Sequence, residues 1–218
     1  MITNSPDRIA VQFLRDELGA IASLAVCAAS DGMTPIINAI NVIGQANGQI
    51  VALSTDRYRA ARFTMPCTPA IEFSVALPTK FVTEFYAAIK TDKSRELVVQ
   101  MIVDGPTVTL ECLAAGITRQ TQVVYGQYPA MGKIFPEWSD EPVTHTPMQL
   151  NANLLAGLAK LTLPEDAGLT PAKRNSVWRM QNTFHSELEK HGPALFTKSS
   201  KDQIFTMEFL IQPVVLPR

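Results

Sequence analysis

LSTDRYRAA, residues 53–61, follows directly on a predicted β-hairpin. Two runs rich in β-branched residues, 36–43 and 50–53, flank the dipeptide Asn47-Gly48. Such a dipeptide tolerates the positive φ angles of a tight hairpin turn, so the two runs are predicted to pair as antiparallel strands. The LSTDRYRAA phrase closes this hairpin and ends the first structural unit of the chain.

Two further phrases stand later in the chain: GQYP (126–129), which continues to IFP (134–136), and FLIQPVVL (209–216). Each phrase has an ordinary structural interpretation. Thr55 and Asp56 are typical of a turn, where a short side chain accepts backbone hydrogen bonds. Residues 128–129 and 211–214 suit an edge strand, because proline is confined to edges and strand starts. The alternative is that the three phrases contribute to one binding site.

The N-terminal segment is predicted to be helical. Residues 5–7 read Ser-Pro-Asp, in which serine is a favourable cap, proline is tolerated in the first turn and aspartate suits the helix dipole. Apolar residues then recur at spacings of three and four, which predicts one buried stripe along about six turns. These residues are Val11, Leu14, Leu18, Ile21 and Ala25.

The rest of the chain repeats a strand and helix pattern. A second unit is predicted as a strand over 71–77, a helix over 79–90 and strands over 97–103, 107–113 and 119–125, with a hairpin at Asp104-Gly105. A polar linker over 137–147 is followed by a strand at 148–150, a helix over 154–161, a loop over 163–175 and strands over 177–181, 194–198 and 204–211. The pattern predicts an α+β fold of about three βαβββ units, with helices on one face of antiparallel sheets.

Composition limits the classes of protein to which the chain can belong. Its 218 residues, 46% of them hydrophobic and 18% charged, are enough to bury a core. The formal net charge is -1, so any contact with nucleic acid must use a local face. Three widely spaced cysteines, Cys27, Cys67 and Cys112, favour buried reduced thiols. No leader and no run of ~18 apolar residues occurs, so we expect a cytoplasmic protein with no membrane contact.

The sequence gives little support for catalysis. His145, His185 and His191 stand in polar contexts, and a metal pair of His185 with Glu187 or His191 is less favoured than ordinary surface histidines. No metalloprotease, serine hydrolase or phosphate-loop motif occurs. We therefore expect no enzyme activity, no metal and no cofactor.

The three phrases, in this order, resemble the β subunit of bacterial DNA polymerase III, the DNA sliding clamp. Residues 9–136 resemble its whole middle domain, and residues 148–216 resemble the closing half of its last domain. The resemblance implies a DNA-clamp fold with a clamp domain at 1–138 and a clamp half-domain at 139–218, as in a shortened phage-type or prophage-type member. It also implies a processivity factor that encircles double-stranded DNA without sequence preference and tethers a DNA polymerase and a clamp loader.

The resemblance implies a pocket for a short linear peptide between these two parts, a physically sensible site because apolar anchors gain affinity in a small cleft. Two positions depart from the family pattern: Ala60 replaces a frequent leucine and Gln212 a common methionine. The pocket residues by match of phrase are Thr55, Arg57, Tyr58, Arg59, Ala60, Pro129, Ile134, Leu210, Gln212, Pro213, Val214 and Leu216.

The helical segments carry candidate DNA-facing cations, which would bind phosphates without sequence preference. Charged residues on helices more often simply face solvent, and Asp7, Asp16, Glu17 and Glu84 share these segments. The candidates are Arg8, Arg15, Lys80, Lys90, Lys93, Lys160, Lys173 and Arg174.

The number of units leads to a hypothesis about assembly. If a ring needs twelve units, as the family's does, and each chain supplies about three, then four chains close it. The lone third unit would need a partner unit from a neighbouring chain, with Leu154, Leu155 and Leu158 in the interface. The alternative is a clamp mimic, an interaction protein that captures clamp-binding peptides of replication proteins but forms no ring.

Overall fold

The computed structural model describes residues 8–31, 33–91, 97–131, 134–136, 148–167, 169, 173–174, 177–185 and 190–213. Two complete βαβββ units come first in this part of the chain. The first unit contains β1 (Arg8–Leu14), α1 (Arg15–Ser23), β2 (Ala39–Gln45), β3 (Gln49–Thr55) and β4 (Arg59–Pro66). The second contains β5 (Phe73–Pro78), α2 (Thr79–Ile89), β6 (Val98–Asp104), β7 (Thr107–Cys112) and β8 (Ile117–Gln122). Both predicted hairpins are confirmed, with positive φ angles at Gly48 and Gly105.

The third unit is reduced. It contains α3 (Ala152–Leu155), β9 (Arg179–His185), β10 (Lys190–Ser199) and β11 (Thr206–Ile211). The strand expected at 148–150 is absent, and the helix expected over 154–161 is a single turn followed by a 3₁₀ turn at Leu158–Lys160. Gly157 separates the two turns, and glycine has a low helix propensity, which explains why the longer helix does not form.

The helix expected from residue 5 is wrong for residues 8–14, which form strand β1; residues 1–7 lie outside the described part of the chain. In this strand Val11 and Phe13 are buried and the residues between them are exposed, which is the alternation of a half-buried strand. β1 pairs antiparallel with β6, so that Val11 lies opposite Met101. Residues 11, 14 and 18 satisfied the helical spacing by chance, and Leu14 is in fact 46% exposed.

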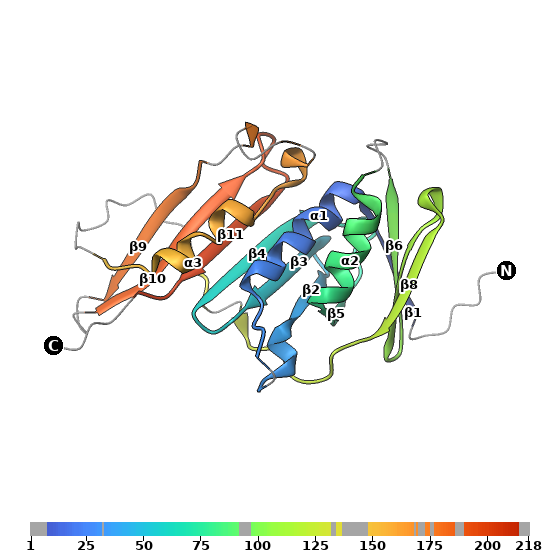
Figure 1. Ribbon diagram of the computed structural model, residues 1–218, viewed down its shortest axis with the longest axis horizontal. Coiled ribbons are helices and arrows are strands. Elements are labelled where there is room, and N and C mark those ends of the chain that lie inside the picture. Colours follow the sequence, from blue (N-terminus) through green and yellow to red (C-terminus); the bar gives the residue numbers. More distant parts are fainter. Residues whose placement is uncertain are drawn as a thin grey trace.

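The two complete units exchange their first strands. β1 pairs with β6 of the second unit, and β5 pairs with β2 of the first unit. The result is a four-stranded sheet in the order β1-β6-β7-β8 and a seven-stranded sheet in the order β5-β2-β3-β4-β11-β10-β9. Helices α1 and α3 cover the same face of the seven-stranded sheet, and α2 packs beside α1 (Figure 1). The expected arrangement of helices on one face of antiparallel sheets is confirmed.

Strand β4, which the sequence analysis did not assign, joins the third unit to the first. β4 pairs with β11 in an antiparallel register that places Ala61 opposite Phe209 and Ala60 opposite Leu210. Phe63 and Phe209 are fully buried in the main core on the helix-covered side of this junction. The closing strands of the chain therefore continue the sheet of its first unit.

The cysteines give a prediction that tests the burial pattern. Cys27 and Cys112 are fully buried, whereas Cys67 is half-buried. Burial raises the pKa of the Cys27 thiol to about 12 and also raises the pKa of Cys67, so the nucleophilic thiolate is scarce at neutral pH. We expect a thiol reagent at pH 8 to modify Cys67 alone in the native protein and all three cysteines after denaturation. Equal reaction rates at the three sites, followed by mass spectrometry, would contradict this burial pattern.

Candidate functional site

The turn between β3 and β4 is held by its own side chains. The hydroxyl of Thr55 donates to the Arg59 carbonyl at 2.9 Å and accepts from the Arg57 amide at 3.2 Å. One carboxylate oxygen of Asp56 accepts from the amides of Tyr58 and Arg59, each at 3.0 Å. Arg57 sits at the positive φ of 78° that closes the turn. The interpretation of Thr55 and Asp56 as turn residues is therefore confirmed. Their hydrogen bonds fix the backbone conformation of residues 55–59.

Arg57 reaches across to a neighbouring loop. Its guanidinium donates to the Asp31 carboxylate at 2.9 Å and to the Thr34 hydroxyl at 2.6 Å. The hydrogen bond from Arg57 is the main reason that the pKa of Asp31 lies below its usual value. This contact connects the turn to the segment that precedes β2, so Arg57 stabilises the conformation of the turn. Its side chain is nevertheless 46% exposed.

A small apolar cluster lies on the face of the seven-stranded sheet that the helices do not cover. Ala60 and Leu210, both predicted site residues, are buried here together with Phe135 of the second phrase and with Met131, which lies between the two parts of that phrase. The Arg62 guanidinium stacks over the Phe135 ring at 4.4 Å and is ion-paired with Glu208. The three phrases thus meet at one place. Remaining members of the cluster are Val51, Leu53 and Leu195.

Exposed side chains surround this buried cluster. Tyr58 is 64% exposed and Ile134 is 42% exposed, while Pro129 and Gln212 are also open to solvent. The backbone amide of Gln212 donates to the backbone carbonyl of Tyr58 at 2.9 Å, which brings the last phrase against the first. Pro213 is half-buried beside it, whereas Val214 and Leu216 lie outside the described residues.

Two details differ from the sequence interpretation. Arg59 is on the helix-covered face, because neighbouring residues of a strand point to opposite faces, and its side chain pairs with Asp56 at 2.9 Å. Arg59 therefore lies across the sheet from Ala60. The edge-strand alternative for residue 211 is wrong, since β11 is an interior strand between β4 and β10 and Ile211 is fully buried. Pro129 is not in a strand at all.

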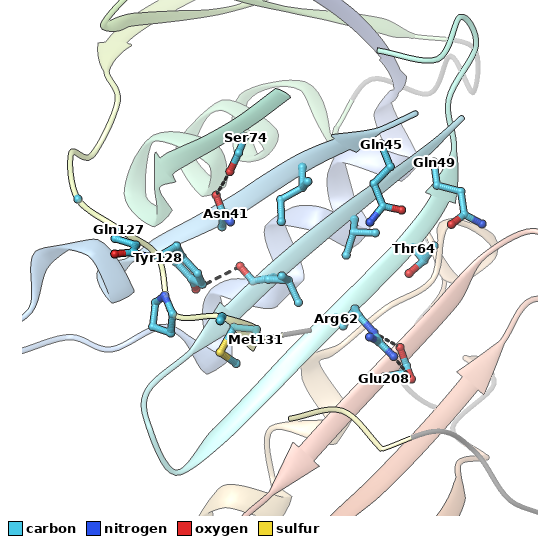
Figure 2. A pocket seen from close by; sticks show the side chains of 16 residues that line it. Asn41, Gln45, Gln49, Arg62, Thr64, Ser74, Gln127, Tyr128, Met131 and Glu208 are labelled. Carbon is cyan, nitrogen blue, oxygen red and sulfur yellow. Dashed lines mark hydrogen bonds and ion pairs between the residues drawn. The ribbon is translucent and has the colours of Figure 1, made fainter. Parts of the chain in front are cut away.

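A larger pocket adjoins the apolar cluster on the same face, and the sequence analysis missed it. Its volume is about 680 Å³, and it lies over β2, β3 and β4 beside the segment 126–131 (Figure 2). Gln45 and Gln49 stand at one end and Asn41 and Gln127 toward the other (Figure 2). Alternation of polar and apolar residues along these strands was the available signal. The apolar residues of the lining are Ile43, Val51, Leu53, Pro129, Ala130 and Met131.

Tyr128 fastens the segment 126–131 to the sheet. Its hydroxyl lies 3.4 Å from the Ala39 carbonyl and 3.3 Å from the Leu53 carbonyl, to which it donates. Burial raises the pKa of Tyr128, so the hydroxyl remains a donor throughout the neutral range. Tyr128 thereby holds Pro129 and Met131 against the outer face of β3.

The DNA-facing candidates are dispersed. Lys80, Lys90 and Lys173 are exposed, and Lys80 lies 3.8 Å from Glu84. Arg8 is exposed on strand β1 rather than on a helix. Arg15 is 8% exposed and paired with Asp16 at 2.8 Å, so it does not present its charge to a ligand. Lys93 lies outside the described residues.

Lys160 and Arg174 do come together. Both line a pocket of about 250 Å³ that α1, α2, residues 160–167 and residue 174 enclose on the helix-covered side of the molecule. Hydroxyls of Tyr86 and Thr162 line the same pocket, as do the carboxylates of Asp16 and Asp166. Asp16 pairs with Arg15 and Asp166 pairs with Lys198, which reduces the negative charge that faces Lys160 and Arg174.

The described part of the chain contains no candidate metal site. There, no three His, Cys, Asp or Glu side chains are grouped so that they could hold a metal ion. His145 and Glu187 lie outside the described residues, as do the side chains of His185 and His191. The described helices also include none that is long and apolar enough to cross a membrane.

Solved structures of bacterial sliding clamps are similar to this chain. The DnaN sliding clamp of Pseudomonas aeruginosa bound to griselimycin has a TM-score of 0.63 and 11% identity, with 99% of this chain and 68% of that chain covered. The β chain of DNA polymerase III from Streptococcus pneumoniae gives 0.61 and 15%, with 99% and 66% covered. The DNA polymerase sliding clamp of Bacillus subtilis gives 0.53 and 15%, with 98% and 51% covered.

The likeness extends over nearly the whole of this chain but over only about half to two thirds of each clamp. No protein-family model matches the sequence. No curated protein matches it either. The chain has the sliding-clamp fold.

Proposed function

We propose that this protein is a DNA sliding clamp-like processivity factor that tethers a DNA polymerase and other replication proteins to duplex DNA. One observation supports this most strongly. The three phrases that resemble clamp motifs converge at the β4–β11 junction, where the Gln212 amide bonds to the Tyr58 carbonyl and Phe135 packs with Leu210. A clamp of this kind needs no catalytic group, because tethering raises the local concentration of the polymerase at the primer end.

The peptide site would lie over the apolar cluster and among its exposed neighbours. A linear peptide gains affinity by placing one or two apolar anchors against a desolvated surface whose edge offers hydrogen bonds. Tyr58 and Ile134 supply exposed apolar surface, and Gln212 supplies an amide at the edge. Because Ala60 and Leu210 are buried within the cluster, a peptide would contact mainly the exposed side chains beside them.

Duplex DNA would lie on the helix-covered side. The pocket lined by Lys160 and Arg174 offers positive charge there, and Lys80, Lys90 and Lys173 are exposed. With a net charge of -1, the protein has no general attraction for phosphates, so contact would be weak, independent of sequence and sensitive to salt. Topological enclosure then retains DNA better than affinity does. Free cysteines fit action in the reducing cytoplasm of a host or phage-infected cell.

Assembly would complete the ring. We divide the chain into a clamp domain at 1–138 and a half-domain at 139–218. The half-domain contributes β9, an edge strand of the seven-stranded sheet. β8 is an edge strand of the other sheet, and β8 and β9 lie at opposite ends of the molecule (Figure 1). An outermost strand offers unpaired backbone groups to another chain. Val177 and Met180, beside and in β9, are 73% and 52% exposed, which suits an interface.

The expected native mass is that of a homotetramer, because four chains supply the twelve units of a closed ring. Sedimentation velocity over a range of concentrations measures it directly. Met180→Lys should shift the mass toward smaller species by placing a charge in the interface, whereas Met33→Lys, at an exposed position that belongs to no edge strand, serves as the control. A monomer at all concentrations would contradict the ring.

A clamp mimic is the second candidate, and one observation favours it. Leu154, Leu155 and Leu158 are half-buried against the chain's own core, so the third unit already covers much of its apolar surface without a partner. A mimic would bind a clamp-motif peptide but would be retained equally on circular and linear DNA. A ring would stay on circular DNA and slide off after linearisation.

A further inference from the structure

The 680 Å³ pocket beside the apolar cluster is rich in carboxamides. Asn41, Gln45, Gln49 and Gln127 line it from β2, from β3 and from the segment that crosses the sheet (Figure 2). Its volume is within the range of about 300–1,000 Å³ that ligand sites occupy in other proteins. The pocket therefore has the size and the polar groups of a binding site.

Much of this hydrogen-bonding capacity is unused within the protein. Asn41 is 5% exposed, and its carbonyl oxygen accepts from the Ser74 hydroxyl at 3.3 Å. Its amide nitrogen makes no hydrogen bond to another described residue. The side chains of Gln45 and Gln127 likewise make no hydrogen bond to described residues. A ligand that fills the pocket would satisfy these donors and acceptors.

The charge of the lining narrows the class of ligand. Arg62 and Glu208 are the charged residues of the described lining, and they form an ion pair with each other. A nucleic acid strand would leave its phosphates without cations here. An uncharged ligand whose groups both donate and accept hydrogen bonds fits better, and a peptide backbone is such a ligand because carboxamide side chains have the same polar groups.

The space open to a ligand continues beyond this pocket. A second hollow of about 240 Å³ continues from it, and the two share Asn41, Ser74, Gly126 and Tyr128. In the other direction the pocket shares Leu53 and Met131 with the apolar cluster. An extended chain anchored over the cluster therefore has a continuous path across the outer face of β3 and β2 toward β5.

We propose that this pocket binds an extended, uncharged polar peptide segment that continues from the anchored motif of a partner protein. The inference rests on the proposed function for the anchored motif, but the carboxamide site itself does not. Once the motif of such a peptide is anchored, binding of the linked polar segment is an intramolecular step. The segment therefore adds affinity even though the motif itself binds no more tightly. The pocket would thus distinguish partners whose motif is flanked by neutral polar residues from partners with charged flanks.

Four synthetic peptides test the proposal: a clamp-binding motif alone, the motif extended by the neutral sequence SQNQSQ at its N-terminus, the motif extended by SQNQSQ at its C-terminus, and SQNQSQ alone. The pocket variant is Gln45→Ala with Gln127→Ala. The control variant is Gln120→Ala with Gln122→Ala on β8, where both side chains are exposed. Affinities are measured by calorimetry, and nuclear magnetic resonance follows the side-chain amide signals of Asn41, Gln45, Gln49 and Gln127 during addition of SQNQSQ.

We expect one extended peptide to bind about tenfold more tightly than the motif alone, with the advantage lost in the pocket variant and kept in the control. SQNQSQ alone should shift the four amide signals. Equal affinities for motif and extended peptides, with no signal shifts, would overturn the inference and leave the proposed function intact. Signal shifts with SQNQSQ but no binding of the motif would support the pocket and contradict the proposed peptide cleft.

Discussion

Lys198→Met is expected to lower the free energy of unfolding by about 3–5 kcal/mol, the cost usually found when one partner of a buried ion pair is removed. Lys198 on β10 pairs with Asp166, and the exposed fractions of their side chains are 3% and 2%. Methionine fills the space of the lysine stem but removes the Lys198 ammonium from the buried Asp166 carboxylate. Urea unfolding followed by circular dichroism measures the loss.

Two comparisons show whether charge burial is the cause. The double variant Lys198→Met with Asp166→Leu removes both charges and should recover most of the lost stability, because well-packed apolar pairs often replace buried ion pairs without cost. Lys80→Met breaks the exposed pair with Glu84 and should change stability by about 0.5 kcal/mol or less. If Lys198→Met were as stable as the native protein, the pair would have no structural role.

The buried pair also supports the helix-covered surface. Asp166 accepts a hydrogen bond from the Leu163 amide at 3.2 Å, and Leu161 and Leu163 are buried in the main core. The pair therefore ties the segment that carries Lys160 and Thr162 to β10. Loss of Lys198 should loosen this segment first, which hydrogen exchange at residues 161–167 would detect.

Local chemistry explains which parts of the fold could be predicted. The hairpins at Gly48 and Gly105 depend on glycine in a tight turn, and helix α2 has a strong apolar stripe over Val82, Phe85 and Ile89, so the sequence alone indicates them. Strand β1 was predicted to be helical because the apolar residues of a short run can fit the periodicity of a helix as well as that of a strand. Its pairing with β6, far along the chain, decides the outcome.

Non-local pairing also limited the prediction of the site. The phrases predicted that residues near Tyr58, Ile134 and Gln212 come together, and the β4–β11 register does bring the first and last phrases side by side. That register is formed between strands distant in the sequence, so local patterns do not contain it. Successive side chains of a strand point to opposite faces, which is sufficient to place Arg59 and Ala60 on opposite faces of β4. A comparison of motifs residue by residue does not take this alternation into account.

Tyr58→Ala is expected to weaken binding of a clamp-motif peptide by about 30-fold, which corresponds to about 2 kcal/mol, the loss typical of a central aromatic contact residue. Tyr58 stands beside Gln212 at the junction of the first and last phrases and is 64% exposed. A tyrosine in this position offers apolar area and a hydroxyl at little cost in side-chain entropy. Fluorescence anisotropy with a labelled motif peptide measures the affinity.

Stability should barely change in this variant, because alanine keeps the backbone carbonyl that accepts from the Gln212 amide and the lost side chain is mostly in solvent. Leu113→Ala, at an apolar position that is 78% exposed on the other sheet, is the control and should leave the affinity unchanged. A folded Tyr58→Ala protein that binds the peptide as tightly as the native one would place the peptide site elsewhere. Equal losses in both variants would indicate nonspecific apolar adsorption instead of a defined site at the β4–β11 junction.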